Sequence, residues 1–258
     1  MRQTIRALGW TIKILWIITL VFPLTVGLSL MELINSKAIG FQEPTASFSE
    51  GQFHFSAPFY INNTGFYDFS DINLTVLAEA KNKPIARFSQ TFPKVSAHSV
   101  LNASYEISFS LEEILSRNSE LLFNDLDVNL NVSLFFRIAY LIGFGIASNL
   151  TMPWGAPFYN FSLTSIRYNS ISQNVSVLLS FENHAQFPVN GTLLIEVVSD
   201  KNELLGSYSE LVNVSSGNEF QKLFEIPVEE PSKITETGFV RVFFESIQIF
   251  EWEGRLID

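Results

Sequence analysis

Cysteine is absent from this 258-residue sequence, and histidine occurs only at His54, His98 and His184. The absence of cysteine excludes disulfides, thiol catalysis, iron–sulfur clusters and Cys-ligated zinc. Three widely spaced histidines are also too few for a His-rich metal site. The sequence further lacks a nucleophile elbow, a P-loop, a dinucleotide-binding fingerprint, a zinc helix and an EF-hand loop. We therefore predict a protein that is not an enzyme and needs no cofactor.

Pairs of acidic residues are the remaining candidates for chemistry. Asp125 and Asp127 alternate along a segment expected to be extended, so both carboxylates point to one side and are candidate ligands for Ca²⁺. The commoner interpretation of such a pair is a solvated face, as it is for Glu112/Glu113, Glu229/Glu230 and Glu251/Glu253. We interpret His98 and His184 as loop or turn residues and not as general bases.

Basic residues are scarce, and their distribution along the chain is uneven. The first 34 residues carry three basic side chains and one acidic one, whereas the other 224 residues carry 13 basic and 25 acidic side chains. A region this acidic repels the phosphates of nucleic acids, so we predict no nucleic-acid partner. Its acidity is compatible with a basic protein partner, and it favours solubility in any case.

Charged residues are absent from Ile14–Met31, which follows a basic N-terminus. An apolar helix over residues 8–34 is long enough, at about 1.5 Å per residue, to span a bilayer core of about 30 Å. The positive charge before it predicts a cytoplasmic tail over residues 1–13 and an extracellular position for the rest of the chain. We therefore predict a single-pass protein of the cell membrane. The alternative is a signal peptide that is cleaved near Ser36–Ala38.

A second apolar stretch, Leu134–Ser148, is interrupted by Arg137, and the part that follows this arginine is too short to cross a membrane. We interpret the stretch as a buried strand pair or a wedge between domains. The alternative is a loop that dips into the membrane.

Sequons for N-glycosylation are numerous, and all of them follow the apolar N-terminal segment. They lie at Asn62, Asn73, Asn102, Asn131, Asn149, Asn160, Asn174, Asn190 and Asn213. A polar strand face rich in Asn, Ser and Thr creates such tripeptides by composition alone, because positions i and i+2 share a face. Alternating apolar residues nevertheless place the sequons on solvent faces, and we predict that several carry glycans. Sequons without cysteine favour an archaeal cell surface over a eukaryotic secretory product.

Phenylalanine is abundant, with 25 residues, and it favours strands and fills the wide space between sheets. Short alternating segments are separated by turn signals at intervals of about eight to twelve residues, which predicts all-β, immunoglobulin-like sandwiches. The exception is Ser110–Leu122, where a serine N-cap precedes two acids and apolar residues. This segment is therefore predicted to be a helix.

One unit of the sequence occurs twice at a nearly constant separation. Asn63 corresponds to Asn183 and Asn82 to Asn202, each 120 positions later. Further matches follow in the same order, pairing Lys94–Ser99 with Asn213–Asn218 and Tyr105–Glu113 with Phe224–Glu230. Such order-preserving matches indicate a duplicated domain.

The segment VSVLLSFENHAQFPVNGTLLIEV resembles the central signature of the late-embryogenesis-abundant group 2 domain, also called the LEA14-like or water-stress and hypersensitive-response domain. Asn183 matches the family asparagine, and Phe187–Val189 match the hydrophobic return that follows it. Asn63 occupies the same place in the first copy. The family proline after the asparagine is replaced by Thr64 and His184.

This resemblance implies a seven-stranded LEA14-type sandwich with a helix and no known catalytic activity. Some members are single-pass membrane proteins with a glycosylated lumenal domain, and a lipid-binding role has been proposed for the fold. We therefore predict tandem sandwich domains over residues 42–152 and 153–258, with a structural or adhesive role through a protein partner or self-association. The alternative is a lipid- or small-molecule-binding accessory module, which an open apolar groove between the sheets would favour.

Overall fold

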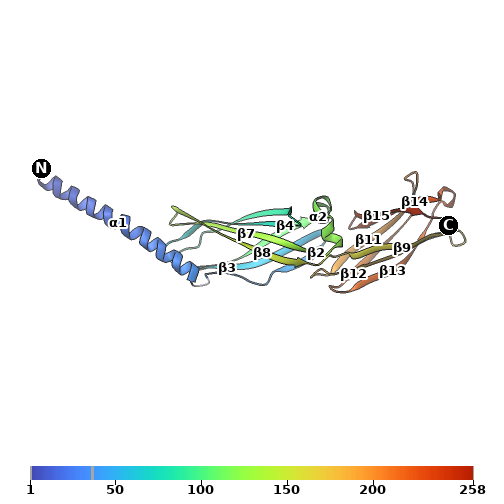
Figure 1. Ribbon diagram of the computed structural model, residues 1–258, viewed down its shortest axis with the longest axis horizontal. Coiled ribbons are helices and arrows are strands. Elements are labelled where there is room, and N and C mark those ends of the chain that lie inside the picture. Colours follow the sequence, from blue (N-terminus) through green and yellow to red (C-terminus); the bar gives the residue numbers. More distant parts are fainter. Residues whose placement is uncertain (1, 36–37, 258) are drawn as a thin grey trace.

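The computed structural model describes residues 2–35 and 38–257. A long N-terminal helix precedes two β-sandwiches that lie end to end (Figure 1). The helix, α1 (Arg2–Asn35), continues through Pro23. Within the described residues it is the one helix that is long and apolar enough to cross a membrane. The predicted all-β fold with one N-terminal apolar helix is confirmed. The alternative cleavage site lies outside the described residues, because Ser36 and Lys37 are not among them.

The first sandwich consists of two facing sheets. In one sheet, β1 and β2 lie along one side of β3, and β6 lies along its other side. The other sheet has the order β5-β4-β7-β8. The strands are β1 (Ile39–Phe41), β2 (Thr45–Ser49), β3 (Gln52–Asn63), β4 (Phe69–Ala80), β5 (Lys83–Phe92), β6 (Ser99–Ser110), β7 (Leu126–Ile138) and β8 (Ile142–Trp154).

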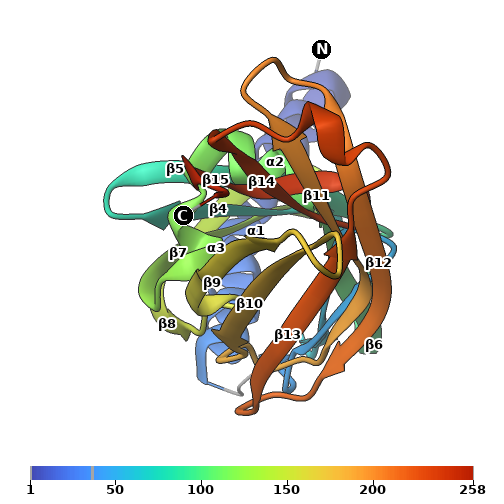
Figure 2. The same ribbon diagram turned by 90° about the vertical axis from the view of Figure 1, so that its right-hand side faces the viewer.

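The second sandwich repeats this topology, with β9 in the place of β1 and β2. One sheet has the order β13-β10-β9 and the other has the order β12-β11-β14-β15. Figure 2 looks along the molecule onto these two layers. The strands are β9 (Tyr159–Asn169), β10 (Asn174–Glu182), β11 (Val189–Ser199), β12 (Leu204–Val214), β13 (Glu219–Pro227), β14 (Thr237–Phe244) and β15 (Ile247–Arg255), with a 3₁₀ turn at Pro231–Lys233.

The alternation of apolar residues determines which face of each strand is buried. In β10, Val175, Val177, Leu179 and Phe181 are at most 1% exposed, as the period-2 pattern predicts. At about 25 cal/mol per Å² of buried apolar surface, such rows supply most of the stabilisation of both sandwiches. The sequon residues lie between these rows.

The helical prediction for Ser110–Leu122 is confirmed with one interruption. Helix α2 (Leu111–Asn118) begins at a capping box, in which the Ser110 hydroxyl accepts from the Glu113 amide and the Glu113 carboxylate accepts from the Ser110 amide. The helix is interrupted at Ser119, and a short second helix, α3 (Glu120–Phe123), follows. Both helices lie at the end of the first sandwich that meets the second one (Figure 1).

Two buried asparagines, Asn63 and Asn183, occupy equivalent turns of the two sandwiches, and both are 0% exposed. The Asn63 amide donates to the carbonyls of Tyr67, Val95 and Ser96, and its oxygen accepts from the backbone of Gly65. The Asn183 amide likewise donates to the carbonyls of Phe187 and Val214, and its oxygen accepts from Ala185. The two asparagines therefore hold their turns through matching contacts in the two sandwiches.

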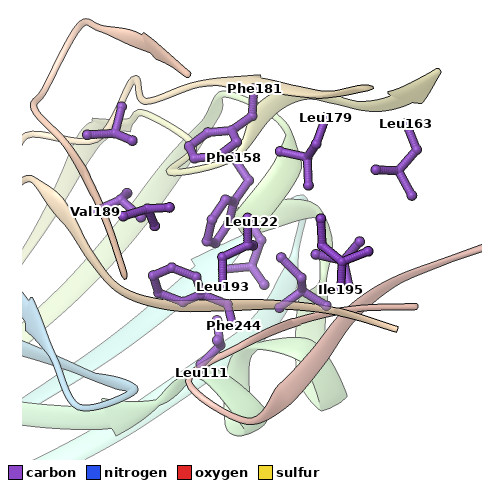
Figure 3. Close-up of a cluster of buried hydrophobic side chains, with 14 of the residues drawn as sticks. Leu111, Leu122, Phe158, Leu163, Leu179, Phe181, Val189, Leu193, Ile195 and Phe244 are labelled. Atoms are coloured by element: carbon purple, nitrogen blue, oxygen red, sulfur yellow. The ribbon is translucent and has the colours of Figure 1, made fainter. Parts of the chain in front are cut away.

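A single buried cluster continues from the first sandwich into the second. Phe48 of β2 lies 5.7 Å from Phe244 of β14, and Phe53 of β3 lies 5.6 Å from Phe187, measured between ring centroids. Figure 3 shows Leu111 and Leu122 of the two short helices packed with Phe158 and other side chains of the second sandwich. Phe158 is only 1% exposed. The two sandwiches are therefore joined by an apolar interface as well as by the chain.

Candidate functional site

The segment that joins the sandwiches is hydrogen-bonded to both of them. The indole nitrogen of Trp154 donates to the Leu121 carbonyl at 2.7 Å, and the Phe158 amide donates to the Leu122 carbonyl at 2.9 Å. Between them, the Ala156 carbonyl accepts from the backbone amide of His184 at 2.9 Å. These bonds hold the end of β8 and the start of β9 against α3 and the β10–β11 loop.

At this junction His184 lies between two carboxylates. Its Nδ1 is 2.7 Å from Asp125 Oδ2, and its Nε2 is 3.1 Å from Glu182 Oε2. The ring also stacks on Tyr159, with 4.1 Å between centroids. A neutral imidazole carries one N–H, so it can donate to only one of these carboxylates, whereas the imidazolium can donate to both. The arrangement therefore favours the protonated ring.

Two members of this cluster, His184 and Glu182, have shifted pKa values. The hydrogen bond with Asp125 raises the pKa of His184 above its ordinary 6.5, and Glu182 adds to this effect. A hydrogen bond from Asn160, followed by the one from His184, lowers the pKa of Glu182. The charged forms of both groups are thus the stable ones, and the cluster is an electrostatic link between the sandwiches.

We expect this link to make stability depend on pH. The raised pKa of His184 gives a stabilisation that is complete below about 6.5 and is lost as pH rises through the folded-state pKa. The lowered pKa of Glu182 gives a second stabilisation, which is present above the ordinary glutamate pKa of 4.5 and is lost as pH falls below it. Between pH 6 and 9, the stability advantage of the wild type over His184→Gln should fall by about 0.5–1 kcal/mol, because the carboxylates are partly solvated.

Urea titrations of both variants across this pH range measure the difference. His54→Gln is the matched control, because its ring bonds the Ser108 hydroxyl instead of a carboxylate. A wild-type advantage over His184→Gln that stays constant from pH 6 to 9 would contradict the proposed ion pairing.

The geometry of the cluster does not suit general-base catalysis. A base needs a free nitrogen facing a nucleophile, but both nitrogens of His184 face carboxylates.

The two candidate calcium ligands have different surroundings. Both oxygens of Asp125 already have partners, because Oδ1 accepts from the Ala156 amide and Oδ2 faces His184. Asp127 lies exposed on β7. In residues 2–35 and 38–257, no group of three or more His, Asp or Glu side chains is arranged to hold a metal. Calcium at this pair stays a prediction.

The nine sequon asparagines all lie outside the buried core. Five are exposed, namely Asn102, Asn149, Asn160, Asn190 and Asn213, and four are half-buried, namely Asn62, Asn73, Asn131 and Asn174. Two pairs face each other directly across neighbouring strands, Asn131 with Asn149 and Asn190 with Asn213. Residues in such pairs have Cβ atoms about 4.5–5.5 Å apart, so glycans on both members would crowd each other.

The stretch Leu134–Ser148 forms a strand pair, as predicted, but much of it is not buried. It spans the β7–β8 hairpin, in which β8 pairs with β7 along its whole length. β8 ends the strand order, so its other edge has no strand neighbour in the described part of the chain. Its inward-facing Ile146 and Leu150 are 44% and 54% exposed, because the opposite sheet does not cover them. Exposure of this edge was not predictable from its composition.

Two shallow depressions lie in the first sandwich. One, of about 200 Å³, lies between β5, β6 and α2 and is lined partly by Phe88, Phe109 and Arg117. The other, of about 630 Å³, lies over the outer face of β4 and β7 beside Arg137 and Tyr140. Both are open to solvent.

The fold and these surfaces define a β-sandwich protein with one N-terminal apolar helix. No family model matches the chain, and no curated protein matches it. Solved structures with some likeness include red sea bream transglutaminase, at 10% identity and a TM-score of 0.30 over 84% of this chain and 31% of that enzyme. A bacterial adhesin from Mobiluncus mulieris has 9% identity and a TM-score of 0.30, covering 79% of each chain. A protein from Archaeoglobus fulgidus has 12% identity and a TM-score of 0.31, over 44% of this chain and 98% of its own.

Proposed function

We propose that this chain is a non-catalytic, membrane-anchored protein that presents two LEA14-type sandwiches outside the cytoplasm and engages a partner through a free strand edge. In this proposal α1 crosses the cell membrane with its N-terminus inside, and the domains comprise residues 42–152 and 153–258. Support for the topology comes from the basic residues Arg2, Arg6 and Lys13, which precede the apolar run.

The LEA14-type assignment is supported by the two buried asparagines. The family signature places an asparagine at the turn between two strands, and Asn63 and Asn183 both occupy that place with their side chains hydrogen-bonded to backbone groups. Glycosylation is part of the same proposal, because the nine sequon asparagines lie outside the core and after the proposed span. A glycan at Asn149 would lie on β8 itself and would limit which partners reach this edge.

The observation that carries the proposed function is the free edge of β8. Over Ile142–Trp154 the strand has no charged residue, and its proline, Pro153, comes next to the last position. Natural edge strands are usually protected from other strands by lysine, proline, bulges or covering segments. A long, uncharged edge with exposed Ile146 and Leu150 instead favours pairing with a strand of another chain.

We expect Ile146→Lys to lower the population of complexes several-fold, because it places a charge on the pairing edge. The measurement is mass photometry of the full chain, solubilised from membranes in detergent, with counts of particles above the monomer mass. Ile171→Lys is the matched control, because the same change is made at a turn residue that is 94% exposed and remote from β8. Monomers alone for the wild type, or equal complexes for Ile146→Lys, would contradict the proposal.

The alternative function, lipid or small-molecule binding, would be favoured by an open groove between the sheets. Of the two depressions, the larger one lies on an outer face, whereas the one between β5, β6 and α2 lies between the sheets. Its volume of about 200 Å³ is below the range of about 300–1,000 Å³ that is typical of ligand pockets. The guanidinium of Arg117 also lies at this depression and donates to the Ile85 carbonyl at 2.8 Å. We therefore prefer partner binding at the edge.

A further inference from the structure

The last turns of α1 pack against the turn between β3 and β4. Phe22 lies edge-to-face against Tyr67, with 5.6 Å between ring centroids. The Thr25 hydroxyl lies 2.7 Å from the Tyr67 hydroxyl, and the Ser29 hydroxyl accepts from the Phe66 amide at 3.0 Å. Val26 and Ser29 are 3% and 1% exposed as a result. The helix therefore meets the first sandwich along its side and not only at its end.

This side contact lies inside the apolar part of the helix. The segment that is apolar enough to cross a membrane is Ala7–Glu32, and a bilayer core takes up about 20 helical residues. Whether these 20 residues are counted forward from Ala7 or backward from Glu32, they include Phe22 and Thr25. The backward count would place Phe22, and with it the β3–β4 turn, near the centre of the bilayer, where lipid-exposed non-helical backbone does not occur. The forward count ends at Val26 and places Phe22 and Thr25 in its last turns, so Tyr67, which contacts both side chains, lies at the bilayer boundary.

Three large side chains are exposed around this contact, although they belong to two separate turns. Phe66 of the β3–β4 turn is 58% exposed, and Tyr140 and Leu141 of the β7–β8 turn are 56% and 75% exposed. Asp68 links the two turns, because its carbonyl accepts from the Ala139 amide at 3.2 Å and its carboxylate lies 3.5 Å from the Tyr140 hydroxyl. Figure 1 shows the β7–β8 turn at the end of the sandwich that holds the helix. We call these three exposed residues the rim.

The charges near the rim do not oppose contact with lipid. Asp68 pairs with Lys94 at 3.3 Å, and Asp71 pairs with Arg137 at 3.4 Å. Each acid is thus balanced by a base. Tyrosine is enriched at membrane boundaries because its ring is apolar and its hydroxyl is polar, and exposed Phe and Leu bury apolar area in the acyl layer.

We infer that Phe66, Tyr140 and Leu141 insert into the boundary between headgroups and acyl chains of the membrane that α1 crosses. This inference rests on the proposed anchoring. With the helix and the rim both held by the bilayer, the first sandwich has a fixed orientation on the membrane, since two turns and a helix are three separate points of attachment. Under this inference, the turn at the tip of the Leu134–Ser148 stretch dips into the membrane, which was the alternative interpretation of that stretch.

The absence of cysteine makes a direct test simple, because one introduced cysteine gives a single labelling site. The full chain is prepared as Leu141→Cys and, separately, as Phe66→Cys, labelled with a polarity-sensitive fluorophore and reconstituted into phosphatidylcholine–phosphatidylglycerol vesicles. A fraction of the lipid carries a nitroxide quencher on its acyl chain. Leu24→Cys, which is 64% exposed within the span, and Ile171→Cys, at the far end of the second sandwich, are the two controls.

We expect a blue shift and a marked loss of emission at positions 24, 66 and 141, and no change at position 171. Quenching at position 24 without quenching at either 66 or 141 would overturn the rim while leaving the anchor intact. No quenching at position 24 would overturn the anchor and, with it, the inference. Labelling at two rim positions keeps the test decisive if one variant folds poorly.

Discussion

Replacement of Asn183 by alanine should lower the free energy of unfolding by about 3 kcal/mol or more. The side chain is 0% exposed, and its amide and oxygen together satisfy the carbonyls of Phe187 and Val214 and the amide of Ala185. Alanine removes all three partners and leaves these backbone groups buried. Each unsatisfied buried group costs about 1–3 kcal/mol, and only some of them can regain a partner from water.

Chemical denaturation followed by circular dichroism measures this loss in the full chain. Asn213→Ala is the matched control, because Asn213 is an exposed strand residue near the same turn, and a change within about 0.5 kcal/mol is expected there. Asn63→Ala should act in the same direction in the first sandwich. Equal stabilities for Asn183→Ala and Asn213→Ala would show that the buried asparagine does not hold the turn.

Gly155→Ala is the second change with a large expected effect. A Cβ at position 155 would lie 1.9 Å from the backbone oxygen of His184 and 2.5 Å from its carbonyl carbon. Backbone atoms cannot rotate away as a flexible side chain does, so the joining segment and the β10–β11 loop must separate. That movement breaks the bond between His184 and Ala156, and we expect a loss of about 3 kcal/mol or more.

Gly145→Ala, within the preceding strand β8, provides the control for this change. No heavy atom lies within 4 Å of the Cβ that it would add. Alanine there should be neutral or slightly stabilising, by up to about 1 kcal/mol, since glycine within a strand loses more conformational entropy on folding. Urea titration gives both values, and limited proteolysis at the joining segment reports its separation. A Gly155→Ala variant as stable as Gly145→Ala would contradict the close backbone approach.

Local patterns were sufficient to predict most of the fold. The period-2 alternation around Val175–Phe181 predicts which face of β10 is buried, and the serine and acids at Ser110–Glu113 predict the start of α2. The correspondence of Asn63 with Asn183 predicts the duplication, and the equivalent strand orders of the two sandwiches agree with it. Each of these features depends on residues close together in the sequence or on a repeat of them.

The candidate sites depend on contacts that such patterns do not contain. Asp125 and His184 are 59 positions apart, and their contact arises from the way the two sandwiches meet. The exposure of Ile146 depends on how far the opposite sheet extends, although the residue itself looks like any core strand residue. The contact of Tyr67 with Phe22 likewise appears only when α1 is placed beside the first sandwich.

The aromatic interface between the sandwiches has a mechanical consequence. Two domains joined only by a linker usually move relative to each other. Here Phe48 and Phe53 of one sandwich pack against Phe244 and Phe187 of the other. The pair should therefore act as one stiff lever with its fulcrum at the base of α1. A sideways pull on the distal turn around Ile171 would then be felt as torque at the membrane instead of being absorbed by a hinge.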